Sequence, residues 1–194
     1  LFTPSKGKVT AGIRGVRKRG AKLSFAAQPF CFAEYVLAEK GGRYTVTAAY
    51  LYDGFYSLRT DIARYYAACS VLEICNALLV EEGESEAVFI AAVEALKGLA
   101  LTEGDAAELL LSFSLTALHQ SGYMIDLDGC GICGGEVKGN AYFDFEAGYF
   151  TCSDCASGVR ASESTYQTLR KCAGLSYDEE KTSGGGKRAL RLIK

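Results

Sequence analysis

Residues 130–155 read CGICGGEVKGNAYFDFEAGYFTCSDC. This stretch holds two Cys-x-x-Cys pairs, Cys130/Cys133 and Cys152/Cys155, which are separated by 18 residues. Their spacing falls within the C-x2-C-x15–20-C-x2-C pattern of zinc sites. Each pair brings two thiolates to one side of a tight turn, and two such turns complete a tetrahedron around one ion. The stretch therefore predicts a zinc ribbon, with two short strands between the cysteine pairs.

Three other uses of these cysteines stay open: disulfides, a redox-active pair, and iron in place of zinc. Disulfides are disfavoured, because the chain shows no secretory signal and a cytoplasmic protein keeps its thiols reduced. A redox-active Cys-x-x-Cys needs only one pair. Protein thiolates fill all four ligand positions, so no position is left for water or substrate. We therefore expect one Zn²⁺ with a structural role, held by Cys130, Cys133, Cys152 and Cys155.

The remaining cysteines and the single histidine offer few candidates for catalytic residues. Cys31, Cys69, Cys75 and Cys172 lie in apolar patterns, where a free cysteine is usually a buried core residue. His119 ends an apolar run, so a core or helix-end position is expected for it. No phosphate-binding G-x-x-x-x-G-K-[ST] loop is present. The sequence thus predicts no catalytic residues, no small-molecule substrate and no enzyme.

On both sides of the ribbon the hydrophobic period is helical. Residues 163–173 predict a short helix that ends at Gly174, and residues 183–186 predict a flexible joint before a basic helix begins at 187. Between about 57 and 122 the pattern predicts a bundle of three helices, the third over 106–120 with a wide apolar face. The first helix is expected to bury Leu58, Ile62, Tyr65, Cys69, Leu72, Asn76 and Leu79; the second, Val88, Ala92, Leu96 and Leu99.

Before residue 56 the apolar period is two, which is typical of strands. Strands are expected over 8–14, 29–37 and 44–50, with the last two joined by a Lys40-Gly41-Gly42-Arg43 hairpin turn. These strands favour a small β-barrel. The expected fold class is therefore α+β: an N-terminal OB-type barrel, then a helical bundle with the ribbon inserted in it.

The charge of the chain is divided sharply along its length. The 194 residues carry 21 Lys+Arg and 23 Asp+Glu, a net charge of −2. Residues 1–30 hold seven basic and no acidic groups, residues 31–155 amount to −13, and residues 156–194 to +4. Such asymmetry is typical of proteins that bind nucleic acid. The longest apolar runs are too short to cross a membrane, so a soluble cytoplasmic protein is expected.

The basic N-terminal segment is the candidate DNA-binding site. Five cations within nine residues repel each other unless an anion joins them, and OB barrels bind oligonucleotides on such surfaces. Of the nearby aromatic residues, Tyr35 and Tyr44 are the best candidates for stacking on bases, although ordinary half-buried rings are equally consistent with the pattern. The other rings are Phe25, Phe30, Phe32 and Tyr50. The five cations are Arg14, Arg17, Lys18, Arg19 and Lys22.

Three short elements carry a resemblance to a known family. They are Leu1-Phe2-Thr3-Pro4-x-x-Gly7-Lys8, Gly15-Val16-Arg17-Lys18 and Gln28-Pro29-Phe30. In this order, followed by a helical bundle and an inserted four-cysteine finger, they resemble the RecO family of DNA-repair proteins over essentially the whole chain. The resemblance implies binding of single- and double-stranded DNA, annealing of complementary strands, and loading of the recombinase RecA together with RecR, at the nucleoid.

The resemblance also implies a domain plan and further partners. An OB domain is expected over 1–56 and a helical domain over 57–194, with the finger inserted at 128–157. Family barrels begin before the Phe-Thr-Pro element, so the barrel is expected to be incomplete. The last helix, which begins at residue 187, is also expected to stop before its pattern is complete. Single-strand-binding protein would dock its acidic tail on the helical domain, where Arg160, Arg170 and Lys171 are local cations. The rival interpretation is a non-enzymatic protein-interaction module that acts through the acidic helical domain.

Overall fold

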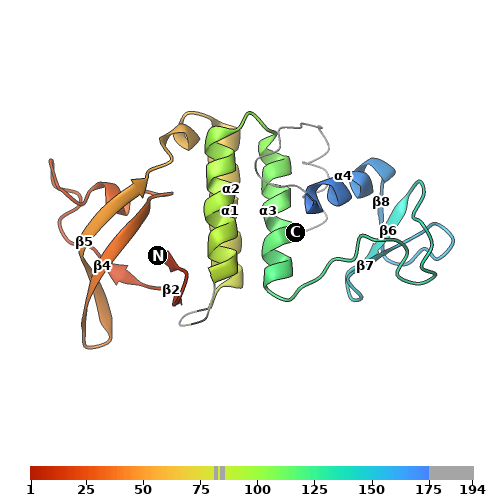
Figure 1. Ribbon diagram of the computed structural model, residues 1–194, viewed down its shortest axis with the longest axis horizontal. Coiled ribbons are helices and arrows are strands. Elements are labelled where there is room, and N and C mark those ends of the chain that lie inside the picture. Colours follow the sequence, from red (N-terminus) through yellow and green to blue (C-terminus); the bar gives the residue numbers. More distant parts are fainter. Residues whose placement is uncertain (81–82, 84–85, 175–194) are drawn as a thin grey trace. The chain divides into compact units, whose positions relative to one another are not determined.

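The computed structural model describes residues 1–80, 83 and 86–174, which form two compact units, Leu1–Leu101 and a second that begins at Thr102 (Figure 1). The fold is mixed α+β, as predicted. The first unit contains strands together with the first two long helices, and the second contains two helices and the cysteine-rich strands. The predicted domain bounds remain a prediction, and the predicted joint at 183–186 and helix from 187 lie outside the described residues.

A long β-hairpin dominates the first unit. Its strands pair antiparallel from Phe32↔Asp53 to Lys40↔Arg43, so the connecting loop is the two residues Gly41 and Gly42. Both glycines have positive φ, 59° and 71°, as a type I′ turn requires. The predicted hairpin turn is confirmed. The strands are β1 (Phe2–Thr3), β2 (Gly7–Lys8), β3 (Ala11–Gly12), β4 (Phe32–Lys40) and β5 (Arg43–Asp53).

The sheet of the first unit stays open. Strand order is β3-β5-β4, while β1 and β2 form a separate pair, and the described residues do not close a barrel. The strand predicted over 8–14 is wrong in extent, because only two-residue pieces pair there and residues 13–31 hold no strand. An apolar cavity of about 760 Å³ lies between the open sheet and the helices, lined by Phe30, Phe32, Leu72 and Phe89 among others.

Helix α1 (Ile62–Leu78) packs on α2 (Glu86–Leu101) through small side chains. The face predicted for the first helix is right only at its ends, where Leu58 and Leu79 are buried: Ile62 is 79% exposed, and Ala68, Val71 and Cys75 are buried instead. Helix α2 buries Ala91, Ala95 and Gly98 besides the predicted Val88, Ala92, Leu96 and Leu99. Small residues on both helices let the backbones approach closely, which the larger residues of the predicted face would prevent.

The start of α1 also caps the end of α2. The Asp61 carboxylate accepts a hydrogen bond from the Arg64 backbone N–H at 3.0 Å and so caps α1. The Arg64 guanidinium donates to the Leu99 carbonyl at 2.6 Å, and the Ser57 hydroxyl, from the short helix η2 (Tyr56–Arg59), donates to the Ala100 carbonyl at 2.9 Å. These two carbonyls belong to the last turn of α2, where a backbone carbonyl has no hydrogen-bond donor within the helix.

The second unit joins two helices to a small three-stranded sheet. Helices α3 (Ala106–Gln120) and α4 (Glu163–Ala173) have the predicted bounds. The strands β6 (Ala141–Asp144) and β7 (Tyr149–Thr151) confirm the predicted ribbon hairpin, and β8 (Val159–Ala161) adds a third strand beside β6. No helix within the described part of the chain has the length and apolar character needed to cross a membrane.

A buried ion pair links α3 to α4. The Glu108 carboxylate is only 3% exposed and lies 2.9 Å from the Lys171 ammonium, which is 33% exposed. Removing the ammonium takes a charge partner away from the buried Glu108 carboxylate, so we expect Lys171→Met to lower the free energy of unfolding by about 3 kcal/mol in a denaturant titration. Lys138→Met removes the exposed Lys138–Glu136 pair. This substitution should change the free energy of unfolding by less than about 1 kcal/mol. Equal effects of the two substitutions would contradict this expectation.

Candidate metal centre and nucleic-acid interface

Four cysteine sulfurs converge in the second unit. The Sγ atoms of Cys130, Cys133, Cys152 and Cys155 all lie within 4.8 Å of one another. The Cys133 and Cys152 sulfurs are 3.9 Å apart. A tetrahedral site with Zn–S bonds of about 2.3 Å has sulfur–sulfur edges of about 3.8 Å. The four cysteines are therefore positioned to bind a metal ion, as the sequence spacing predicts.

Backbone hydrogen bonds shape the first cysteine pair. The Cys130 N–H donates to the Gly135 carbonyl and the Gly134 N–H donates to the Cys130 carbonyl, each at 2.8 Å. The Gly131 N–H donates to the Phe150 carbonyl of β7 at 2.9 Å, which ties the turn to the sheet. A Cβ on Gly131 would stand 2.3 Å from the Tyr149 ring, so the turn can lie this close to β7 only with glycine there.

The cysteine set belongs to the hydrophobic core of the unit. Cys130 is buried and clusters with Phe150, Tyr166 and Leu169. The Tyr166 ring packs on Phe150 at 5.0 Å, and its hydroxyl donates to the Leu127 carbonyl at 2.9 Å. The cluster also contains Leu111 and Leu115 of α3. A metal bound here would therefore hold together the ribbon and the core that α3 and α4 share with it.

The cysteine thiols differ in pKa. Backbone N–H groups of Cys133 and Cys152 hydrogen-bond the Cys130 sulfur and lower its pKa to about 6, whereas the hydrogen bond with Cys152 raises the pKa of Cys155 to about 12. Burial raises the pKa of Cys75 to about 12 and that of Cys172 to about 11. A thiolate is the form that ligates metal, and a buried neutral thiol is inert. The assignment of Cys75 and Cys172 to the core is thus confirmed by their burial.

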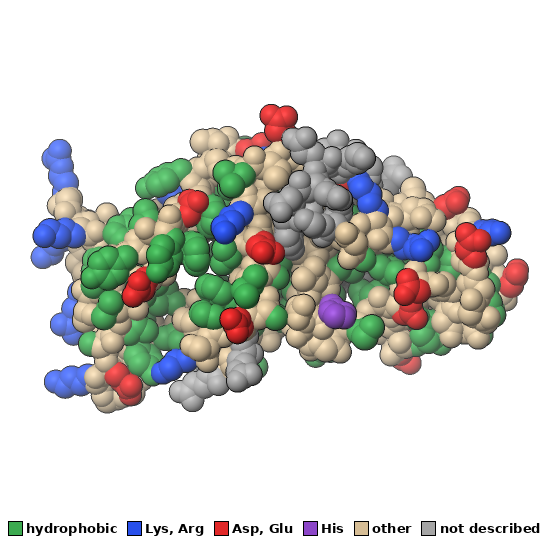
Figure 2. Space-filling view, in the orientation of Figure 1, with side chains coloured by type: hydrophobic (Ala, Val, Ile, Leu, Met, Phe, Trp, Pro, Cys, Tyr) green, Lys and Arg blue, Asp and Glu red, His purple; other side chains and the backbone are tan. Residues whose placement is uncertain are grey.

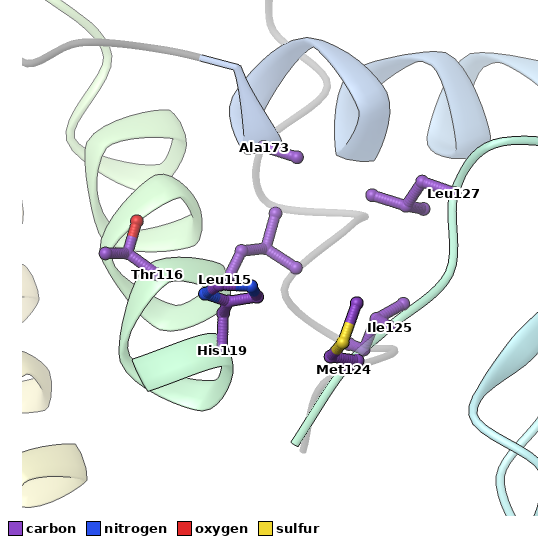
Figure 3. A pocket seen from close by; sticks show the side chains of 7 residues that line it. All are labelled: Leu115, Thr116, His119, Met124, Ile125, Leu127 and Ala173. Atoms are coloured by element: carbon purple, nitrogen blue, oxygen red, sulfur yellow. The ribbon is translucent and has the colours of Figure 1, made fainter. Parts of the chain in front are cut away.

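His119 lies at the exposed end of α3, beside a small pocket of about 260 Å³. Figure 3 shows its imidazole and the Leu115 side chain on one side of the pocket, with Met124 and Ile125 opposite and Ala173 of α4 above. The lining is mostly apolar, and Thr116 is the other polar residue. Among the described residues that line the pocket, His119 is the one base. It lies in the last turn of α3, so its predicted helix-end position is confirmed.

All five cations of the basic loop (residues 14–22) are exposed to solvent. The loop follows β3 without forming a strand, and in the part of the chain that the structure describes none of the five side chains takes part in an ion pair. Figure 2 shows Lys and Arg side chains spaced along the outer edge of the strand-rich part of the molecule. The five are Arg14, Arg17, Lys18, Arg19 and Lys22. The loop is therefore accessible to a polyanion.

The aromatic side chains near this loop are only partly available. The Tyr35 ring is half-buried and its hydroxyl donates to the Ala26 carbonyl at 3.2 Å, and burial raises its pKa. The Tyr44 ring is also half-buried, with the Lys6 ammonium 5.6 Å from its centroid. The rings of Tyr50 and Tyr52 are instead about 60% exposed on β5.

The three cations named for the second domain differ in availability. Arg160 on β8 and Arg170 on α4 are exposed, and the Arg170 guanidinium lies 6.0 Å from the Tyr166 ring centroid. Lys171 is held by Glu108 in the buried ion pair. Of the three, Arg160 and Arg170 are the ones that a ligand can reach.

Comparison with known proteins gives matches over nearly the whole chain. The family model described as Recombination protein O N terminal matches residues 1–55, and Recombination protein O C terminal matches residues 59–182. The chain is 31% identical over 185 residues to the DNA repair protein RecO of Myxococcus xanthus, covering 93% of this chain and 73% of that protein. It is 28% identical over 155 residues to the DNA repair protein RecO of Acetivibrio thermocellus. The same protein of a Thermoanaerobacter species is 29% identical over 155 residues. In these two cases 80% of this chain is covered, and the match spans 62% of the relative's length.

Proposed function

Because this chain belongs to the RecO family of DNA repair and recombination proteins, we propose that it is a recombination mediator that works by binding DNA. In this proposal it binds single- and double-stranded DNA, promotes annealing of complementary strands, and assists loading of the recombinase RecA together with RecR. It catalyses no covalent step. A protein with this role acts on the chromosome, so the proposal places it at the nucleoid in the cytoplasm.

The observation that carries the proposal is the exposed basic loop. Arg14, Arg17, Lys18, Arg19 and Lys22 reach solvent, and within the described residues no acidic side chain pairs with them. Phosphate contacts of this kind do not read sequence, which suits a protein that must act on any gap in DNA. Annealing is slowed by repulsion between the phosphates of two strands. A cationic surface that binds both strands lowers that repulsion.

The proposed metal is one Zn²⁺ with a structural role. Four thiolates at tetrahedral spacing are the donor set of structural zinc, and they leave no ligand position open for water. Zinc at Cys130, Cys133, Cys152 and Cys155 would fix the two turns against β7 and keep the buried core around Phe150 and Tyr166 intact.

The proposed protein partners are RecR and single-strand-binding protein. The acidic tail of the latter needs accessible cations on the second unit, and Arg160 and Arg170 meet that requirement. Lys171 is a poorer candidate, because its ammonium already neutralises the buried Glu108 carboxylate.

Fluorescence anisotropy of a labelled oligonucleotide, titrated with this chain at several salt concentrations, tests the proposal. Each phosphate contact on a single strand contributes about 0.7 to the slope of log affinity against log salt. Five contacts therefore predict an affinity for single strands that falls with salt with a slope of at least about 3.5 in magnitude. Duplex DNA should also bind. Absent or salt-independent binding would overturn the proposal and favour a protein-interaction module that acts through the acidic helices.

A further inference from the structure

The tip of the β4–β5 hairpin carries two positive charges directly opposite each other. Lys40 and Arg43 form the last register pair, and only Gly41 and Gly42 separate them along the chain. Both side chains are exposed. Among the described residues neither forms an ion pair or a side-chain hydrogen bond. Like charges at directly opposite positions destabilise a hairpin, so this pair weakens the element that it closes.

The basic loop begins about four residues of strand from this tip, on the same sheet. Strand β3 runs parallel to β5 and pairs Gly12 with Thr45, which is two residues from Arg43. Two residues of a strand span about 7 Å. Arg14, the first cation of the basic loop, follows two residues after Gly12. Because β3 runs parallel to β5, the chain leads away from the tip after Gly12, and Arg14 lies about four residues of strand, or about 13 Å, from Arg43. Figure 2 shows Lys and Arg side chains spaced along one edge of this unit.

The acidic residue next to this pair in the chain lies on the other face of the hairpin. Glu39 is opposite Tyr44 in the register, and successive side chains of a strand point to opposite faces. Lys40 and Arg43 therefore share a face from which Glu39 is excluded. An anion that approaches this face meets two cations and no carboxylate from the closing pairs of the hairpin.

We propose that Lys40 and Arg43 are a second phosphate-binding site, which continues the basic loop into one track for the backbone of single-stranded DNA. The inference rests on the proposed DNA-binding function and adds two contacts to the five in the loop. Bound phosphates would neutralise the repulsion between the two cations, which explains why a destabilising pair stands at the tip. The contact is to the backbone, so it carries no sequence preference.

The test compares the full chain with its Lys40→Ala/Arg43→Ala variant in the same anisotropy titration. Two lost contacts should reduce the salt slope by about 1.4, from near 4.9 to near 3.5, whatever the oligonucleotide sequence. The matched control is Lys97→Ala/Lys138→Ala, which removes the same net charge from exposed positions on α2 and the ribbon. A slope for the tip variant equal to that of this control would overturn the inference.

A second variant separates binding from folding. Arg43→Glu leaves Lys40 facing a carboxylate, so the cross-strand pair becomes attractive and the melting temperature should rise. Affinity for DNA should fall at least as far as in the double-alanine variant. Unchanged DNA affinity in this stabilised variant would also overturn the inference. If instead the unmodified chain binds no DNA, the proposed function itself fails, and the two failures are thereby distinguished.

Discussion

Replacement of Cys130 by Ser is expected to abolish metal binding and to unfold the second unit. Three thiolates and a hydroxyl bind zinc far more weakly than four thiolates, and structural zinc sites contribute roughly 10–16 kcal/mol of binding free energy. That contribution is comparable to the whole stability of a typical domain, about 5–15 kcal/mol. Cys130 also lies in the core with Phe150 and Tyr166, so the loss reaches α4 as well as the ribbon. Metal content per chain should fall from one to near zero, with a loss of helical circular dichroism.

The control for this experiment is Cys69→Ser, which changes a half-buried cysteine of α1 that is not a ligand. It should keep one metal per chain and nearly the full helical signal. A strong chelator added to the unmodified protein should reproduce the Cys130→Ser result without any substitution. A Cys130→Ser variant that retains stoichiometric metal and its melting temperature would contradict the assignment of the four cysteines as ligands.

The sequence predicts best those elements whose ends are fixed by residues within or next to the element. Helix α3 begins after Asp105, whose carboxylate accepts from the Ala107 and Glu108 N–H groups. Helix α4 begins after Ser162, which accepts from the Thr165 N–H, and ends at Gly174. The cysteine pairs likewise fix their own turns. In each case the decisive interaction joins residues a few positions apart, which a reading of the sequence can recognise.

The features that sequence reasoning misses depend on partners distant in the chain. The period of α1 fits either a face of large residues or one of small residues, and only the alanine-rich surface of α2 selects Ala68, Val71 and Cys75. Strand β8 has three residues and exists because β6 offers it a free edge. Tertiary context decides both features.

Simultaneous replacement of Arg17, Lys18 and Arg19 by Ala is expected to lower the affinity for single-stranded DNA by about 100-fold at 0.1 M salt. Each lost phosphate contact removes about 0.7 from the slope of log affinity against log salt, so three remove about two. At 0.1 M salt each contact contributes about a factor of five, which gives the 100-fold loss. All three side chains are exposed in a loop without strand or helix, so the melting temperature should stay unchanged.

The matched control for the loop replaces Arg17 and Arg19 by Lys, which keeps every charge and removes the planar guanidinium groups. Since counterion release depends on the number of charges that meet phosphates, this variant should keep the full salt slope. A reduced slope would show instead that the guanidinium groups make specific bidentate contacts. A triple-alanine variant with the slope of the unmodified chain would remove the loop from the DNA-binding surface. DNA binding would then have to rest on cations elsewhere in the chain, with the hairpin tip as the first place to look.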